Sequence, residues 1–391
     1  MRYGRQAMRA AAMGGVLLLG ACGGSSEQGS VGVSGGGATG GTATVTAQQL
    51  EDQRSNAAVA ANADAAYRAG FTGRGVKIAI LDTGLQPGLS EFAGRVDPAS
   101  GDMAGTRGLV DTSGHGTAMA AVALAARDAQ GMHGVAPEAT LLSLNASDPA
   151  KCKSITECDM SGEGFLRAID VAIAQKARVI NMSFAGDSTH PVFNAAVQKA
   201  AAAGIVMVIS AGNNDSGGRE PLLMPRAFAE AAPGWVIIAG GHDANGSFYT
   251  KGANQAGSGP AAAAFLTALG KEITMIDRQG KLVEYDGTSG AAAAISGAVA
   301  LIAQARPNLS GAQIVTLLLD NATDAGAPGR DAVYGNGILN VAKALAAAPA
   351  GVAFSGKCHE VTSLIVASCG LLLWGSTDKA SFPARSGTLR S

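Results

Sequence analysis

Three short segments of this chain carry an aspartate, a histidine and a serine, and a fourth carries an asparagine, in settings that suit acyl transfer. The segments are residues 79–84 (Ala-Ile-Leu-Asp-Thr-Gly), 113–117 (Ser-Gly-His-Gly-Thr), 210–213 (Ser-Ala-Gly-Asn) and 286–291 (Asp-Gly-Thr-Ser-Gly-Ala). A serine hydroxyl becomes a nucleophile when a base lies within hydrogen-bonding reach and a third group fixes the tautomer of that base. We therefore predict Ser289 as the nucleophile, His115 as general base and then general acid, and Asp82 as the group that orients the imidazole.

The tetrahedral intermediate of such a reaction needs hydrogen-bond donors for its oxyanion. The side-chain amide of Asn213 and the backbone N–H of Ser289 are the candidates. Asn213, like Asp82, directly follows an apolar run that predicts a buried strand, and sites in open α/β sheets lie at such strand ends. Ser289 opens an Ala-rich run that predicts a helix, and the free N–H groups of a helix N-terminus suit a developing negative charge.

Apolar runs typical of strands alternate along the chain with longer runs typical of helices. Strands are predicted at residues 76–81, 140–145, 178–183, 205–210 and 235–240, and helices at residues 115–127, 162–176, 192–203, 290–305 and 311–319. Ser310 and Gln313 form the pattern of a capping box for the last helix. Residues 273–276 and 282–285 flank a short turn segment, which predicts a hairpin. The alternation predicts an α/β fold with a doubly wound, mostly parallel sheet and helices on both faces.

In their order along the chain, the four segments resemble those of the subtilisin-like serine peptidases, the subtilases. Three further segments resemble that family too, namely residues 133–137 (His-Gly-Val-Ala-Pro), 181–186 (Asn-Met-Ser-Phe-Ala-Gly) and 334–340 (Tyr-Gly-Asn-Gly-Ile-Leu-Asn). The resemblance covers residues 60–345 and implies the subtilisin-like fold. It also implies a serine endopeptidase that hydrolyses proteins or peptides through an acyl-enzyme intermediate. The residue order excludes the α/β-hydrolases, in which the nucleophile precedes its partners.

The segment after Ser289 departs from the family, which usually has Met-Ala-(Ala or Ser)-Pro there. This chain has Gly-Ala-Ala-Ala at residues 290–293. Alanine in place of proline suits a helix interior, so we expect an unbroken backbone. Gly290 adds conformational freedom beside the nucleophile. That freedom leaves an alternative open, a catalytically impaired subtilase fold that acts as a binding or scaffold protein.

The resemblance further implies a substrate-binding cleft with two walls. A substrate strand would pair with the first wall, and the side chain before the scissile bond would pack between the two. The walls consist of Ser183, Phe184, Ala185 and Gly186, and of Ser210, Ala211 and Gly212. Because these residues are mostly small and all uncharged, we expect medium apolar or aromatic side chains to be accepted in preference to Lys or Arg.

Residues 1–22 have the pattern of an export signal, in which three arginines precede an apolar stretch too short to span a bilayer. The stretch ends Leu-Gly-Ala-Cys, which resembles a bacterial lipobox and implies lipidation of Cys22. A plain signal peptide is the alternative. Since no aspartate follows Cys22, the resemblance implies an exported outer-membrane lipoprotein of a Gram-negative bacterium, at the cell surface or in the periplasm.

Composition then divides the rest of the chain. Residues 23–50 are predicted to be a Gly/Ser-rich flexible tether, residues 51–348 the peptidase domain, and residues 349–391 a tail of uncertain structure. The formal net charge of the 391 residues is −1, which gives no case for nucleic acid as a partner. We expect a monomer that contacts the membrane only through its lipid anchor.

The remaining cysteines form two local pairs, Cys152 with Cys158 and Cys358 with Cys369. In an oxidising compartment we expect disulfides, the first of them Cys152–Cys158. A metal pair is the competing interpretation, but Cys-x5-Cys is poor spacing for zinc. We expect catalysis to need no cofactor. Some relatives bind structural calcium after the histidine helix, where residues 127–131 and Glu91 offer oxygens, so calcium is possible, although no metal ligands are predicted.

Overall fold

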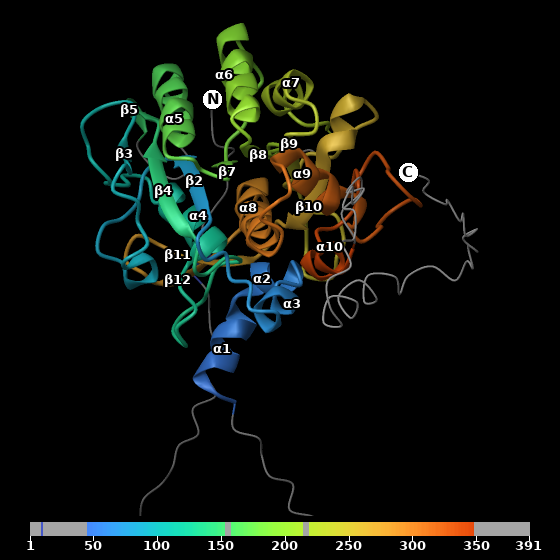
Figure 1. Ribbon diagram of the computed structural model, residues 1–391, viewed down its shortest axis with the longest axis horizontal. Coiled ribbons are helices and arrows are strands. Elements are labelled where there is room, and N and C mark those ends of the chain that lie inside the picture. Colours follow the sequence, from blue (N-terminus) through green and yellow to red (C-terminus); the bar gives the residue numbers. More distant parts are fainter. Residues whose placement is uncertain (1–8, 11–44, 153–157, 214–218, 348–391) are drawn as a thin grey trace, which may run out of the picture. The chain divides into compact units, whose positions relative to one another are not determined.

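The computed structural model describes residues 9–10, 45–152, 158–213 and 219–347 (Figure 1). Seven strands form one sheet in which every neighbouring pair is parallel. In spatial order they are β10 (Phe265–Leu269), β9 (Val236–His242), β8 (Val206–Ser210), β7 (Val179–Met182), β2 (Lys77–Asp82), β4 (Thr140–Asn145) and β3 (Gly101–Asp102). The predicted α/β class and parallel sheet are confirmed. β2, which ends in Asp82, lies between β7 and β4 in the interior of this sheet.

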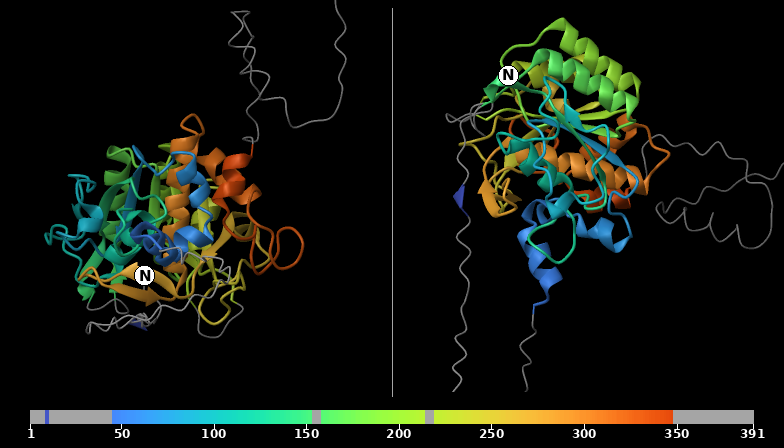
Figure 2. Two further views of the ribbon diagram at one scale, coloured as in Figure 1. Left: turned by 90° about the horizontal axis from the view of Figure 1, so that it is seen from below. Right: turned by 90° about the vertical axis from the view of Figure 1, so that its left-hand side faces the viewer.

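Helices cover both faces of the sheet, as the two views in Figure 2 show. One face is covered by α5 (Gly162–Ala174), α6 (Pro191–Ala202) and α7 (Leu223–Ala231). The other is covered by α4 (His115–Leu124), α8 (Thr288–Ala305) and α9 (Gly311–Asp320), together with the smaller helices α2 (Asn56–Ala60), α3 (Asp64–Arg68) and α10 (Val341–Ala346). Two hydrophobic cores result, one on each face.

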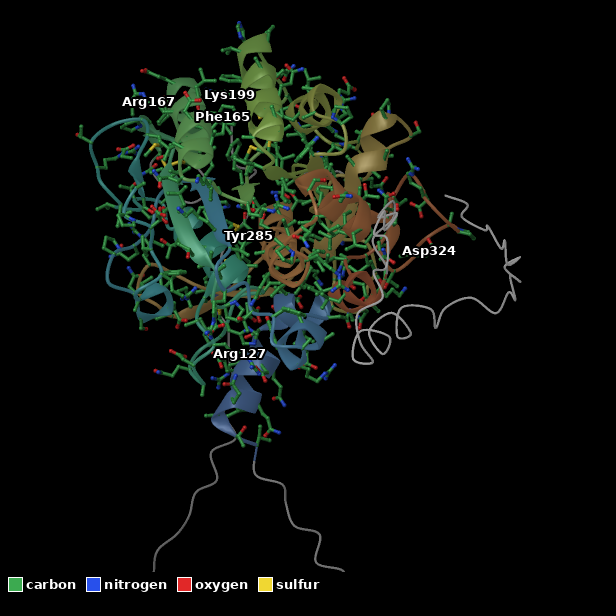
Figure 3. All side chains as sticks on the ribbon, in the orientation of Figure 1. Arg127, Phe165, Arg167, Lys199, Tyr285 and Asp324 are labelled. Carbon is green, nitrogen blue, oxygen red and sulfur yellow. A yellow bond between two sulfur atoms is a disulfide. The ribbon has the colours of Figure 1, made fainter. Side chains whose placement is uncertain are left out.

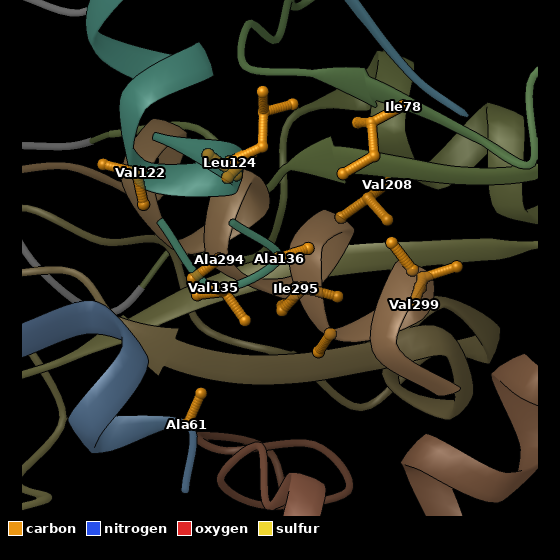
Figure 4. Close-up of a cluster of buried hydrophobic side chains, with 14 of the residues drawn as sticks. Ala61, Ile78, Val122, Leu124, Val135, Ala136, Val208, Ala294, Ile295 and Val299 are labelled. Atoms are coloured by element: carbon orange, nitrogen blue, oxygen red, sulfur yellow. The ribbon is translucent and has the colours of Figure 1, made fainter. Parts of the chain in front are cut away.

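The strands feed both cores because successive side chains of a strand point to opposite faces. In β2, Ile78 and Ile80 enter the core around α4 and α8, whereas Ala79 and Leu81 enter the core around α5. Figure 4 shows part of the first core, where Ile78 and Val208 of the sheet lie near Val299 of α8. α8 is long and apolar enough to cross a membrane, but 89% of it is buried inside the protein. It is therefore the central helix of a core.

The remaining elements lie at the periphery of the sheet. They are α1 (Ala47–Arg54), the 3₁₀ turns η1 (Ser90–Phe92) and η2 (Pro260–Ala264), the β5 (Ser147–Cys152) and β6 (Cys158–Met160) pair, and a small sheet of β1 (Arg9–Ala10), β12 (Leu282–Tyr285) and β11 (Ile273–Ile276). β11 and β12 pair antiparallel, which confirms the predicted hairpin. The capping box of Ser310 and Gln313 is also confirmed.

Two differences from the sequence-based expectations have clear physical causes. Residues 47–50, assigned to the flexible tether, are helical, because Thr46 and Gln49 form a capping box that begins α1 at Ala47. β10 was not predicted, although it extends the main sheet by pairing with β9 over five residues. Its neighbours in sequence are irregular, so the periodic signal around it is weak. Cys22, Cys358 and Cys369 lie outside the described residues.

Candidate active site

The end of β2 and the start of α4 bring the predicted acid and base together. Asp82 is the last residue of β2 and His115 is the first of α4. Oδ1 and Oδ2 of Asp82 lie 2.8 Å and 3.1 Å from Nδ1 of His115, and both side chains are fully buried. Because an ionised carboxylate only accepts hydrogen bonds, this contact assigns the proton to Nδ1. Nε2 is then the basic atom of the imidazole.

Ser289 is the second residue of α8, where backbone N–H groups have no partner within the helix. Its hydroxyl donates to the carbonyl oxygen of Ser183 at 2.8 Å, and the Ser183 hydroxyl donates back to the Ser289 carbonyl at 2.8 Å. A hydroxyl carries one hydrogen. Ser289 must therefore turn away from Ser183 before it can pass its proton to a base.

Asn213 follows β8 and lies beside the start of α8. Its Oδ1 accepts hydrogen bonds from the backbone N–H and the hydroxyl of Thr288, both at 2.9 Å. Both bonds end on the oxygen, so they orient the amide and leave its NH₂ group on the side away from Thr288. An amide held in this way can offer an N–H to a developing oxyanion beside Ser289 without reorganising.

Tyr285, the last residue of β12, lies beside the predicted base. Its ring packs edge-on against His115, with centroids 5.9 Å apart, and the Ser289 side chain is near its hydroxyl. Burial raises the pKa of the Tyr285 hydroxyl far above its usual range, so the hydroxyl stays protonated. Figure 3 labels Tyr285 in the interior of the molecule. Tyr285 therefore packs against the predicted base from the β11–β12 hairpin.

The two predicted cleft walls continue from the ends of β7 and β8. Phe184 is buried and packs edge-on against Phe165 of α5, with centroids 6.5 Å apart. Its side chain therefore lies in the core, and its backbone alone remains for a substrate strand. Gly212 has φ +95°, and a Cβ there would lie 2.7 Å from Cγ of Leu222, whose N–H donates to Ala211 at 3.0 Å. Leu222 is thus an apolar neighbour of the second wall that sequence reasoning missed.

Gly290, the residue that departs from the family pattern, is tightly packed. A Cβ at this position would collide with the side chain of Ile273 in β11. α8 nevertheless runs unbroken from Thr288 to Ala305, as expected for alanine in place of proline. The glycine is therefore matched to a larger neighbour, which occupies the volume that its missing side chain leaves.

Two further polar residues of the site were not identified from the sequence. Thr83 and Asp111 are both fully buried, and their side chains hydrogen-bond to each other at 2.8 Å. Asp111 lies three residues before Gly114, the N-cap of the helix that His115 begins. An aspartate just ahead of a predicted helix is a capping signal, which could have drawn attention to it.

The cysteine expectation is confirmed where the structure describes it. Cys152 and Cys158 form a disulfide with an S–S distance of 2.03 Å. The bond joins β5 to β6 at the end of their antiparallel pairing. This pairing replaces the competing interpretation of these two residues as a metal pair.

The loop considered for calcium, residues 127–131, packs against α1. The Glu51 carboxylate accepts hydrogen bonds from the backbone N–H groups of Asp128 and Ala129 at 3.0 Å and 2.9 Å. This part of the loop therefore presents N–H donors to α1, whereas a calcium ion needs oxygen ligands. Glu91 is 9% exposed and its Oε2 has no partner among the described residues. Burial, with the charges of Asp128 and Glu51, raises the pKa of Glu91 to about 7. The residues thus fit a cation in part, through Glu91, but no described group of three or more acidic, His or Cys side chains forms a metal site.

Comparison with known proteins gives the site a context. The sequence model of the subtilase family matches residues 73–337 of this chain. Subtilisin DY of Bacillus licheniformis is 31% identical over 286 residues, which cover 71% of this chain and 94% of that protein. The minor extracellular protease Epr of Bacillus subtilis is 29% identical over 278 residues, which cover 70% of this chain and 39% of Epr.

Among the solved structures that resemble this one are two proteases. MycP1 with its N-terminal propeptide removed matches with a TM-score of 0.59 and 26% identity, over 74% of this chain and 96% of that chain. MycP3, a protease from the type VII (ESX-3) secretion system, matches with a TM-score of 0.58 and 28% identity, over 74% and 87%. These likenesses agree with the parallel sheet and its two helical layers.

Proposed function

Because this chain belongs to the subtilase family of serine peptidases, we propose that it is an endopeptidase that cleaves proteins or peptides with Ser289, His115 and Asp82. The observation that carries the proposal is the buried 2.8 Å contact between Asp82 and His115, beside a Tyr285 ring that packs against His115. An acid that holds the base by a hydrogen bond is the part of a Ser-His-Asp triad that prepares the base to take the proton of the serine.

In the proposed reaction, Ser289 Oγ attacks the scissile carbonyl carbon while its proton passes to Nε2 of His115. Asp82 stabilises the resulting imidazolium, which then gives the proton to the departing amine as the C–N bond breaks. An acyl-enzyme and a free amine remain. A water molecule then attacks the ester with the same base, and the acid product leaves as Ser289 regains its proton.

The negative charge on the carbonyl oxygen grows during both attacks. The proposed donors are the NH₂ group of Asn213, oriented by its bonds to Thr288, and the backbone N–H of Ser289 at the start of α8. Both belong to groups that are ordered before the substrate arrives, so they stabilise the transition state at little cost in reorganisation.

The test compares Ser289→Ala with Ser296→Ala, a control in the same helix whose hydroxyl bonds only to Asn181 in the described structure. We expect wild type and Ser296→Ala to cleave casein and to react with a fluorophosphonate, and Ser289→Ala to do neither. A folded wild-type protein that neither cleaves casein nor takes up the inhibitor would contradict the proposal. It would favour the alternative of an inactive fold with a binding or scaffold role.

We further propose that the protein is exported and held to a membrane by a lipid on Cys22. As a separate proposal, a structural calcium ion could bind near Glu91. The lipobox-like sequence supports the anchor, and the Cys152–Cys158 disulfide suits an oxidising compartment. Metabolic labelling with palmitate should be lost in Cys22→Ala and kept in Cys152→Ala. A label that persists in Cys22→Ala would contradict the anchor.

A further inference from the structure

Asp111 lies in the buried space between the two elements that carry the acid and the base. Its carboxylate accepts five hydrogen bonds. They come from the Thr83 hydroxyl at 2.8 Å, the backbone N–H groups of Ser113 at 3.1 Å and Gly114 at 2.8 Å, and the backbone N–H and hydroxyl of Thr117 at 2.8 Å and 2.7 Å. The side chain is fully buried. One carboxylate therefore ties the two residues before α4 to Thr117 in its first turn, in which His115 is the first residue.

Thr83 extends this network to the acid. Its hydroxyl donates to Asp111 and accepts from the backbone N–H of Gly116 at 2.9 Å and the Ser113 hydroxyl at 3.0 Å. The backbone N–H of the same residue donates to Oδ1 of Asp82 at 2.8 Å, the atom that faces His115. Thr83 thus bonds to the catalytic carboxylate through its backbone and to Asp111 through its side chain.

The two backbones also touch. A Cβ at Gly116 would collide with the carbonyl of Gly84, so α4 approaches the turn after β2 as closely as backbone allows. No side chain separates the two backbones at this contact. The distance between them therefore depends on the hydrogen bonds that join the two elements. The crossing bonds include those that Thr83 and Asp111 make, together with one from the Gln86 N–H to the Thr117 hydroxyl at 2.9 Å.

We propose that Asp111 is a positioning residue for the reaction, which sets the distance and angle between Asp82 and His115 through Thr83. The inference rests on the proposed peptidase function and adds a residue to it. Asp111 touches neither the substrate nor the reacting atoms. It acts by holding the turn after β2 against the first turn of α4.

A cation that touches this loop does not compete for the carboxylate. Arg278, at the tip of the β11–β12 hairpin, donates from Nη1 to the backbone carbonyls of Asp111 at 3.3 Å and Thr112 at 3.0 Å. It holds the loop before His115 from outside. The Asp111 side chain is thus committed to α4 and Thr83.

The experiment compares two pairs of variants in the full-length protein. Asp111→Asn replaces one acceptor oxygen by an NH₂ group that must face N–H or O–H donors. Thr83→Val removes only the bridging hydroxyl at constant shape, whereas Thr83→Ser keeps it. Asp331→Asn is the matched control, because Asp331 accepts three backbone N–H groups, those of Ala327, Val333 and Tyr334, and no described bond of it reaches β2 or α4.

We expect Asp111→Asn and Thr83→Val to lower kcat on the order of 10- to 100-fold with KM within about twofold, because misplacement of reacting groups affects the transition state more than substrate binding. Thr83→Ser and Asp331→Asn should keep kcat within about twofold of wild type. The low-field proton resonance of His115 Nδ1, assigned by its loss in His115→Ala, should shift or broaden in the first two variants.

The outcomes separate the inference from the function on which it rests. If folded Asp111→Asn and Thr83→Val keep both wild-type kcat and the wild-type resonance, Asp111 is not a positioning residue. If Asp111→Asn does not fold, the Thr83 pair decides by the same two measurements. If wild type itself shows no turnover, the proposed function fails, and the resonance still reports whether Asp111 positions the Asp82–His115 pair.

Discussion

The side chain of Asn213 illustrates how a single residue gains a role from its neighbours. The backbone N–H and the hydroxyl of Thr288 both donate to the amide oxygen of Asn213, at 2.9 Å each. The NH₂ group of the amide can then donate a hydrogen bond to the oxyanion. The role of this residue could be predicted from the sequence, because Asn213 follows the strand-like run at residues 205–210. The orientation of the amide could not, since it depends on Thr288, 75 residues further along the chain.

Removing this donor should lower kcat with little change in KM. For Asn213→Ala we expect a loss on the order of 10² to 10³ in kcat, the size known for one such donor in subtilisin itself. Asn213→Asp keeps the oxygen that bonds to Thr288 and loses the N–H groups, so it should lose as much. Steady-state kinetics on a peptide anilide check this. Wild-type kcat in both variants would show that Asn213 is not the oxyanion donor.

The surroundings of Gly290 differ from what the sequence suggests. From the sequence alone, the glycine is expected to give the backbone conformational freedom beside the nucleophile. In the structure, the Ile273 side chain fills the space in front of it, and the helix backbone is regular. The alternative of a catalytically impaired fold rested mainly on the flexibility of Gly290. Packing against Ile273 restrains the backbone at this position, so that argument is weakened.

This match predicts a compensating pair. Gly290→Met should lower the free energy of unfolding by about 1–3 kcal/mol, because the new side chain overlaps Ile273. Adding Ile273→Ala, which vacates that space, should recover most of the loss. Urea unfolding of the two single variants and the double variant measures the coupling. Additive losses in the double variant would mean that the two side chains do not share one space.

At the scale of elements, α1 secures the loop that follows the histidine helix. Glu51 accepts two N–H groups of that loop, and Asp52 forms two hydrogen bonds with Arg127 at 2.9 Å and 2.8 Å. Figure 3 labels Arg127 at this end of the molecule. The helix was missed because its contacts are with residues about 75 positions away, and its own sequence is polar and close to that of a tether.

Glu91, at the edge of this arrangement, should make stability depend on pH. Its pKa is raised from 4.5 to about 7, chiefly by burial, so the folded state holds the proton more tightly than the unfolded state. The stabilisation is complete below pH 4.5 and is lost as the pH rises through about 7. Its size is on the order of 1–3 kcal/mol. Glu91→Gln, which cannot ionise, should lose this dependence and exceed wild type in relative stability at pH 8.

Thermal unfolding between pH 4.5 and pH 8 measures the effect, with Glu163→Gln as an exposed control. A difference between wild type and Glu91→Gln that stays constant over this range would contradict the assignment. The same scans at pH 8 with calcium chloride or a chelator test the proposed ion. A bound cation should raise the Tm of wild type and leave that of Glu91→Gln unchanged.

At the scale of the whole molecule, the alternation of apolar runs predicted five of the seven strands of the main sheet and missed β3 and β10. The strand at residues 140–145 has the predicted bounds, and the other four predicted strands agree within two residues at each end. Buried parallel strands leave this strong signal because both of their faces are apolar. The order of the strands and the short helices that cover the sheet edges depend on contacts between distant segments, which no local pattern records.

The described structure also predicts the smallest chain that should fold and act. α10 closes the fold, because Val341 and Ala344 are fully buried and the Val341 N–H donates to Ala61 at 2.9 Å. A chain of residues 46–347 keeps this helix and the capping box of α1, so it should keep wild-type kcat/KM within about twofold. A chain of residues 46–340 loses the buried valine and should be about 2 kcal/mol or more less stable. Denaturant unfolding and peptide hydrolysis compare the two, and equal stability would show that α10 is dispensable.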